Sequence, residues 1–152
     1  MIQISDDIII KTLARVLVPF ILLYALYVIM HGHHSPGGGF QGGVILGASL
    51  VLLVITHGLK DTQKRISEKS VAIFSSLGVL IYAGIGVLCL ILLGNFLDYS
   101  KLAILLNVPL AQARSLGILG VEIGVGLAVM AVMFSIFCNI ATGGKQAEED
   151  ND

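Results

Sequence analysis

One glutamate and three histidines are the residues of this chain whose types and positions could do chemistry. Glu122 lies in the glycine-rich apolar run SLGILGVEIGVGLAV, and His31, His33 and His34 lie in the segment HGHHSPGGGFQGG. Because an isolated carboxylate is costly in hydrocarbon, Glu122 should face a protein interior, meet a cation or change its proton affinity. An ion or proton path is the usual setting for such a residue, and a polar tie between packed helices is the structural alternative.

The three histidines raise the question of a metal site, since imidazole binds transition metals readily. No cysteine or carboxylate lies close to them in the sequence to complete a set of ligands. We therefore predict that these histidines form hydrogen bonds at the membrane surface and respond to pH, and that they hold no metal.

No group of residues in the sequence would make the chain an enzyme by itself. No nucleophile occurs with its base, and PGGGFQGG lacks the Gly-Lys-Ser/Thr ending and the preceding strand of a nucleotide-binding loop. The net charge of -1, without a sustained basic face, gives no reason to expect a nucleic-acid partner. We expect no cofactor, and any redox chemistry would belong to a larger complex that contains this chain.

The composition is that of a membrane protein, with 56% hydrophobic and 12% charged residues among 152 and a mean hydropathy of +0.94. A membrane-spanning helix needs about 20 mostly apolar residues. The expected fold class is all-α, an integral membrane bundle of four transmembrane helices, at about 8–30, 40–59, 70–93 and 116–141. These helices make residues 1–142 one membrane domain, followed by an acidic cytoplasmic tail at 143–152.

Lysine and arginine are distributed unevenly between the two sides of such a bundle. One side would hold Lys11, Arg15, Lys60, Lys64, Arg65, Lys69 and Lys145. The other side would hold only Lys101 and Arg114, in the connection between the third and fourth helices. The positive-inside rule therefore predicts that both termini and the second loop lie in the cytoplasm.

The glycine-rich part of the first loop predicts backbone that does not form a regular helix. Consecutive glycines expose their peptide groups and permit positive φ angles. Non-helical backbone at membrane depth persists only where it is buried in protein or lines a watery cavity. We therefore expect a packing and re-entrant element that requires neighbouring protein, made of Pro36, Gly37, Gly38, Gly39, Phe40, Gln41, Gly42 and Gly43.

Small residues recur at helical spacing inside the predicted helices. Gly43 and Gly47 form a G-x-x-x-G pair in the second helix, and Gly117, Gly120 and Gly124 follow one another at steps of three and four in the last helix. In lipid, this spacing predicts that helices approach one another closely.

The segment GHHSPGGGFQGG, followed by an apolar helix, resembles the signature of the MnhB/MrpB family, small subunits of multisubunit Na+/H+ antiporters of the Mrp type. The resemblance extends to the four-helix layout and to a glutamate in the glycine-rich last helix, so it covers essentially the whole chain. It implies an integral subunit of a cation/proton antiporter in a prokaryotic plasma membrane. The implied partners are the other subunits and the bilayer, and the implied transported ions are Na+ and H+.

The resemblance also leaves an alternative assembly open. A similar domain occurs in complexes that couple such an antiporter to a membrane-bound hydrogenase, a sulfane reductase or a formate-oxidising module, and Gln41 and the histidines around the motif are closer to that second group.

Within either assembly, one buried carboxylate cannot complete a route across about 30 Å of hydrocarbon, so other chains must contribute to any path. We expect Glu122 to contact ions or protons, with His31, His33 and His34 as surface participants. The alternatives from other classes are a purely structural scaffold, whose glycine faces dock larger subunits, and a small channel assembled from copies of this chain.

Overall fold

The computed structural model describes residues 4–32 and 37–142, and the part of the chain that it describes is helical without strands. The elements in chain order are α1 (Ile4–Met30), α2 (Gly38–His57), α3 (Leu59–Arg65), α4 (Glu68–Ile91), η2 (Tyr99–Lys101), α5 (Leu102–Leu106) and α6 (Leu110–Thr142). Four of the helices are long and apolar enough to cross a membrane, namely α1 from Ile8, α2, α4 and α6. The all-α fold with four spanning helices is therefore confirmed.

The last helix differs most from its predicted bounds, because α6 begins at Leu110 and the prediction begins near residue 116. Pro109 directly precedes it, and the carbonyl of Pro109 accepts a hydrogen bond from the Ala113 N–H at 3.0 Å. Proline is well tolerated at the start of a helix, since its missing N–H would have no partner there. The prediction missed this early start because Gln112 and Arg114 are polar, and the predicted span was placed on the apolar run that follows them.

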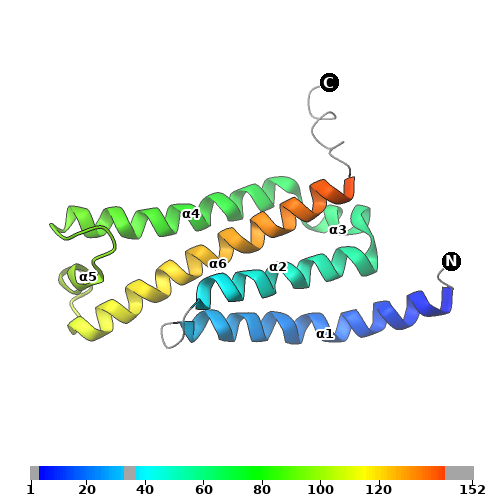
Figure 1. Cartoon of the computed structure of the whole chain (residues 1–152), viewed down its shortest axis with the longest axis horizontal. Coiled ribbons are helices and arrows are strands. Elements are labelled where there is room, and N and C mark those ends of the chain that lie inside the picture. The colour runs from blue at the N-terminus through cyan, green and yellow to red at the C-terminus, as the bar shows by residue number, and fades with distance from the viewer. Residues whose placement is uncertain (1–3, 33–36, 143–152) are drawn as a thin grey trace, which may run out of the picture.

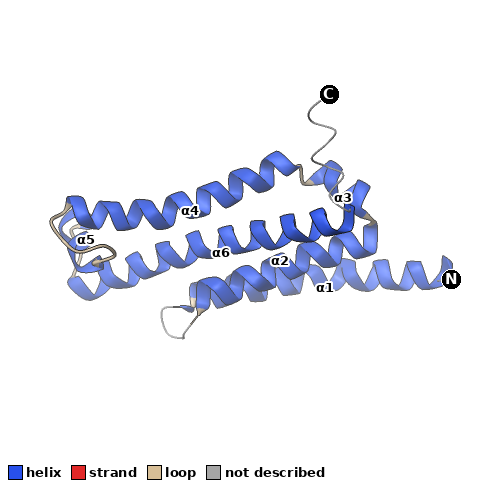
Figure 2. Cartoon of the chain, turned by 45° about the horizontal axis from the view of Figure 1, so that its top comes forward, coloured by secondary structure: helices blue, strands red, loops and turns tan. Residues whose placement is uncertain are grey.

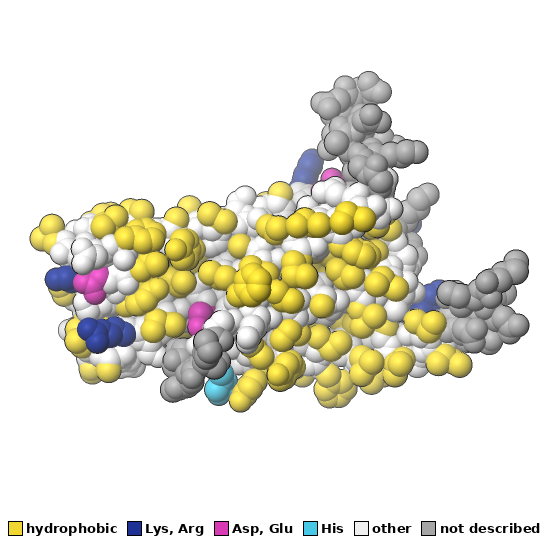
Figure 3. Space-filling model, viewed as in Figure 1, with side chains coloured by type: hydrophobic (Ala, Val, Ile, Leu, Met, Phe, Trp, Pro, Cys, Tyr) yellow, Lys and Arg dark blue, Asp and Glu magenta, His cyan; other side chains and the backbone are white. Residues whose placement is uncertain are grey.

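The four long helices form a row, in the order α4, α6, α2 and α1 (Figure 1). The helix α6 packs against both α4 and α2, and α1 packs mainly against α2. Accordingly, the buried side chains form three small groups between neighbouring elements, which include Ala25 with Leu46, Val54 with Phe134, and Cys89 with Ala113. The row therefore has two broad apolar faces that lipid or other proteins must cover, and Figure 3 shows one of them.

The two ends of the row differ in what they hold. The start of α1, the helix α3 and the end of α6 lie at one end, and α5 lies at the other (Figures 1 and 2). Toward the α5 end, the point where α1 ends and α2 begins lies well short of the tips of α4 and α6 (Figure 1). The junction between α1 and α2 therefore lies beside the middle part of α6 and not beside its tip.

Glycines allow α6 to approach both of its neighbours closely. A Cβ atom added to Gly78 of α4 would lie 2.5 Å from the Gly124 carbonyl oxygen, and one added to Gly124 would lie 2.8 Å from the Gly78 carbonyl oxygen. On the other face, a Cβ on Gly43 of α2 would lie 2.7 Å from the Gly126 carbonyl oxygen. These distances are too short for any side chain, so the predicted close packing is confirmed at these positions.

Two glycines of α4 provide a matched test of this packing. Gly78→Ala should destabilise the chain by roughly 1–3 kcal/mol, because the added methyl group meets the backbone of α6. Gly84→Ala adds the same methyl group to the same helix where no atom lies within 4 Å, so its higher helix propensity should leave the stability equal or slightly raised.

The measurement is the temperature above which the detergent-solubilised chain no longer elutes as a monodisperse peak. Equal melting temperatures for the two variants would contradict the packing described here.

Candidate functional site

Glu122 lies on α6 beside the junction between α1 and α2. At 1.5 Å per residue, it is about 18 Å along the axis from Leu110 and about 30 Å from Thr142. A Cβ atom added to Gly39, in the first turn of α2, would lie 2.6 Å from the Glu122 carbonyl oxygen. The backbones of α2 and α6 therefore meet at the residue that carries the carboxylate.

The carboxyl group of Glu122 packs against Gly32, directly after α1. A Cβ atom added to Gly32 would overlap all three atoms of that carboxyl group. Gly38 in turn lies against the backbone of Gly32, where an added Cβ would overlap the Gly32 Cα. Glu122 as a residue is half-buried, and its Oε2 atom is fully buried. The junction thus covers one side of the carboxylate and leaves the rest of the residue partly accessible.

The N-terminal end of α2, with its positive partial charge, lies beside Glu122. Gly37, the residue before the helix, adopts φ 87°, and no side chain caps the helix. The first N–H groups of a helix have no partner within it, and the positive end of the helix dipole favours a nearby anion. Since Gly39 touches the backbone of Glu122, α2 begins next to a group that carries negative charge when it is ionised.

The glycine segment is helical where the sequence predicted irregular backbone. Residues Gly38–Gly43 form the first turns of α2, so the prediction of a non-helical re-entrant element is wrong for them, whereas the predicted span at 40–59 already included residues 40–43. Gly42 faces the Ala25 carbonyl oxygen of α1, whereas Gly39 and Gly43 face α6. Packing on two sides offsets the conformational entropy that helical glycines lose, which local propensity alone would not predict. Within residues 37–43, Gly37 alone adopts a positive φ.

The larger residues of the same segment point away from this packing. Phe40 is 59% exposed, and Gln41 is also exposed. They follow Gly39 directly, so they lie on the outer side of the helix turn that contacts Glu122. Pro36, the first residue of the predicted element, lies outside the described residues.

Of the three candidate histidines, the structure places His31 alone, and His33 and His34 lie outside the described residues. His31 is exposed, its Nδ1 lies 3.2 Å from the Tyr27 carbonyl oxygen, and its ring centroid lies 4.1 Å from that of Tyr27. Its immediate neighbour Gly32 contacts the Glu122 carboxyl group. The structure therefore brings together the two regions that sequence reasoning had treated separately. Within residues 4–32 and 37–142, no three histidine, cysteine or acidic side chains gather as metal ligands.

Sequence reasoning missed Tyr99, which packs over α6 on the α5 side of Glu122. A Cβ atom on Gly117 would lie 2.5 Å from the Tyr99 ring. Burial raises the pKa of the Tyr99 hydroxyl, and the charges of Cys89, Tyr82 and Glu122 add to this effect. No local pattern identifies this contact, because it depends on how the connection after α4 folds back onto α6.

Charged side chains gather at the α5 end of the row. The Ser100 hydroxyl and backbone N–H donate to the Asp98 carboxylate, and the side-chain bond is the main cause that lowers the pKa of Asp98. The positive charges of Lys101 and Arg114 lower it further. Arg114 therefore acts on Asp98, which sequence reasoning did not consider as its partner.

The fold and the site define a multi-pass membrane protein with an acidic side chain packed into the junction between its first two spanning helices. The model of the family described as "Domain related to MnhB subunit of Na+/H+ antiporter" matches residues 9–135. The chain belongs to this MnhB family, as the motif in its first loop had indicated.

Two curated relatives, both named as Na(+)/H(+) antiporter subunits, match along most of their length. The chain is 31% identical to the one from Bacillus subtilis (strain 168) over 133 residues, which are 84% of this chain and 93% of that protein. It is 29% identical to the one from Alkalihalophilus pseudofirmus over 140 residues, which are 90% of this chain and 94% of that protein. No solved structure matches the chain significantly.

The contact between Gly32 and Glu122 can be tested by a double-mutant cycle. Gly32→Ala should destabilise the chain, because its methyl group and the carboxyl group would occupy the same space. Glu122→Ala removes the carboxyl group, so adding Gly32→Ala to this variant should cost much less. Thermal unfolding of the four proteins should give a coupling free energy of about 0.5–3 kcal/mol. Additive effects would show that the two residues do not touch.

Proposed function

We propose that this chain is a non-catalytic integral subunit of a multisubunit Na+/H+ antiporter, in which Glu122 forms part of the ion or proton path. Membership of the MnhB family and the names of the two relatives support the antiporter. The single observation that carries the role of Glu122 is the packing of its carboxyl group against Gly32, in the junction between α1 and α2. The redox-driven assemblies are less favoured, because both relatives are named as antiporter subunits.

The arrangement of the helices supports a path that other subunits complete. Glu122 is only half-buried, and Phe40 and Gln41 are exposed on the adjoining turn of α2. A partly accessible carboxylate at membrane depth is costly against acyl chains, so a polar group of a neighbouring subunit should lie against it. The other subunits, the bilayer, Na+ and H+ are the partners of this proposal, and His31, His33 and His34 remain its candidate surface participants.

Glu122→Gln distinguishes this role from a purely structural one. Glutamine keeps the size and hydrogen-bonding capacity of the side chain, but its amide cannot release a proton and bind a cation in its place. The complex should assemble, and Na+-driven proton movement in everted membrane vesicles should fall by about tenfold or more. The control is Asp98→Asn, which neutralises an acid outside the spanning helices and should leave transport unchanged.

Assembly and transport that are unaltered in Glu122→Gln, across pH and Na+ concentration, would remove Glu122 from the path. The scaffold hypothesis would then be preferred. Loss of assembly in Glu122→Gln, with normal transport in the residual complex, would point to the same conclusion.

The proposed location is a prokaryotic plasma membrane, with both termini in the cytoplasm. The excess of lysine and arginine at the end of the row that holds α3 supports this orientation. In a variant without its native cysteines, Ser100→Cys should react with an impermeant thiol reagent in intact cells, and Ser5→Cys should react only after the membrane is opened. The opposite pattern would invert the topology.

A further inference from the structure

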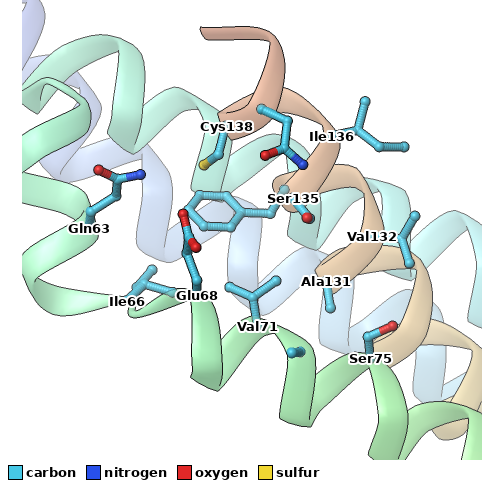
Figure 4. Close-up of a pocket in the computed structure, with 13 residues that line it drawn as sticks. Gln63, Ile66, Glu68, Val71, Ser75, Ala131, Val132, Ser135, Ile136 and Cys138 are labelled. Atoms are coloured by element: carbon cyan, nitrogen blue, oxygen red, sulfur yellow. The ribbon is translucent and has the colours of Figure 1, made fainter. Parts of the chain in front are cut away.

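A cavity of about 380 Å³ lies between α4 and α6, at the end of the row that holds α3 (Figure 4). Its apolar lining includes Val71, Ala131 and Phe134, and its polar lining comprises Gln63, Glu68, Ser75, Ser135 and Asn139. None of these residues belongs to the site around Glu122, which lies farther along α6. The cavity is in the volume range of small-molecule sites, roughly 300–1,000 Å³.

A hydrogen-bond donor, the Gln63 side-chain N–H group, and a hydrogen-bond acceptor, the Glu68 carboxylate, line this cavity. The side chains of Gln63 and Glu68 lie near one another at one end of the cavity, close to Cys138 (Figure 4). The Nε2 atom of Gln63 is buried and donates to no other atom among the described residues. A buried N–H group is costly without an acceptor, and the carboxylate of Glu68, which is an exposed residue, can accept hydrogen bonds from a cation that enters the cavity. The occupant should therefore offer an acceptor and a cation close together.

The position of the cavity along the helices limits what that occupant is. Glu68 is the first residue of α4, and Asn139 lies one turn from the end of α6, so these two polar groups are at the ends of two spanning helices, whereas Ser75 and Ser135 lie deeper in the same helices. The ends of spanning helices lie where lipid headgroups lie, and the deeper, mostly apolar part of the cavity is at the depth of the acyl chains. A carboxylate and amides at the mouth, above an interior whose only polar side chains among the described residues are those of two serines, match a phospholipid better than they match a soluble ligand.

We propose that the cavity between α4 and α6 binds the headgroup and the upper acyl segment of a phospholipid with a primary ammonium group, that is, a phosphatidylethanolamine. The ammonium group donates to the Glu68 carboxylate, and a phosphate oxygen accepts from the Gln63 amide. Phosphatidylcholine has a cation without N–H donors, and phosphatidylglycerol has no cation, so both should bind less well. This inference rests on the spanning helices and does not depend on the role of Glu122 in transport.

The test is native mass spectrometry of the purified, delipidated complex titrated with phosphatidylethanolamine, phosphatidylcholine and phosphatidylglycerol of identical acyl chains. The wild-type complex should bind at least one phosphatidylethanolamine about tenfold more tightly than either other lipid, because a charge-assisted hydrogen bond is involved. Glu68→Gln should abolish this preference. Ser135→Trp, which fills the cavity without changing its charge, should abolish binding of all three lipids there. The matched control Asp98→Asn removes a carboxylate at the other end of the row and should retain the preference.

Two results would overturn the proposal. Equal affinities for the three lipids in the wild-type complex, or a preference that persists in both Glu68→Gln and Ser135→Trp, would show that the cavity does not select this lipid. Loss of another subunit from the complex in Ser135→Trp, without any lipid preference in the wild type, would assign the cavity to a protein partner. Lipid selectivity and transport are separate readouts, so transport loss in Glu122→Gln has no bearing on this result.

Discussion

Contact between helix backbones at glycines is the constraint on which the rest of this structure depends. In a membrane, burial of apolar side chains between helices gains little, since lipid is equally apolar, and close van der Waals packing must hold the helices together. Gly78 and Gly124 bring α4 against α6, and Gly43 and Gly126 bring α2 against the other side of α6. The two glycine faces of α6 make it the middle of the row, with neighbours on both sides.

A row held together in this way has no common core. Its buried groups lie between successive pairs of elements, and each is small. Much of α1 faces outward, including Phe20 at 64% and Leu23 at 63% exposure. Such a chain is stable where lipid or larger subunits cover its two faces, which agrees with its place in a multisubunit assembly. A channel made of this chain alone would need several copies packed together through these faces, because one row does not enclose a pore.

The sequence predicted the parts of the fold that depend on composition and on the spacing of residue types along a helix. The four spans followed from apolar length, and the close packing of α6 followed from the spacing of its glycines. It could not show that the helix would begin at Gly38 and Gly39, before the predicted span at 40–59, because consecutive glycines favour irregular backbone and only contacts with α1 and α6 reverse that preference. The position of Glu122 against Gly32 was equally inaccessible, since about 90 residues of chain separate them and no local pattern links the two. Tyr99 was missed for the same reason.

The same constraint that packs the helices also positions the acidic group, so the scaffold and path hypotheses share one structural basis. Gly39 lets α2 meet α6 at Glu122, and Gly32 leaves the space that the carboxyl group fills. Any movement of α1 and α2 relative to α6 would therefore change the surroundings of the carboxylate directly. A carboxylate whose surroundings change with helix position can hold a proton in one arrangement and release it in another. A neighbouring subunit that binds the exposed faces of α1 and α2 could in this way act on Glu122 without touching it.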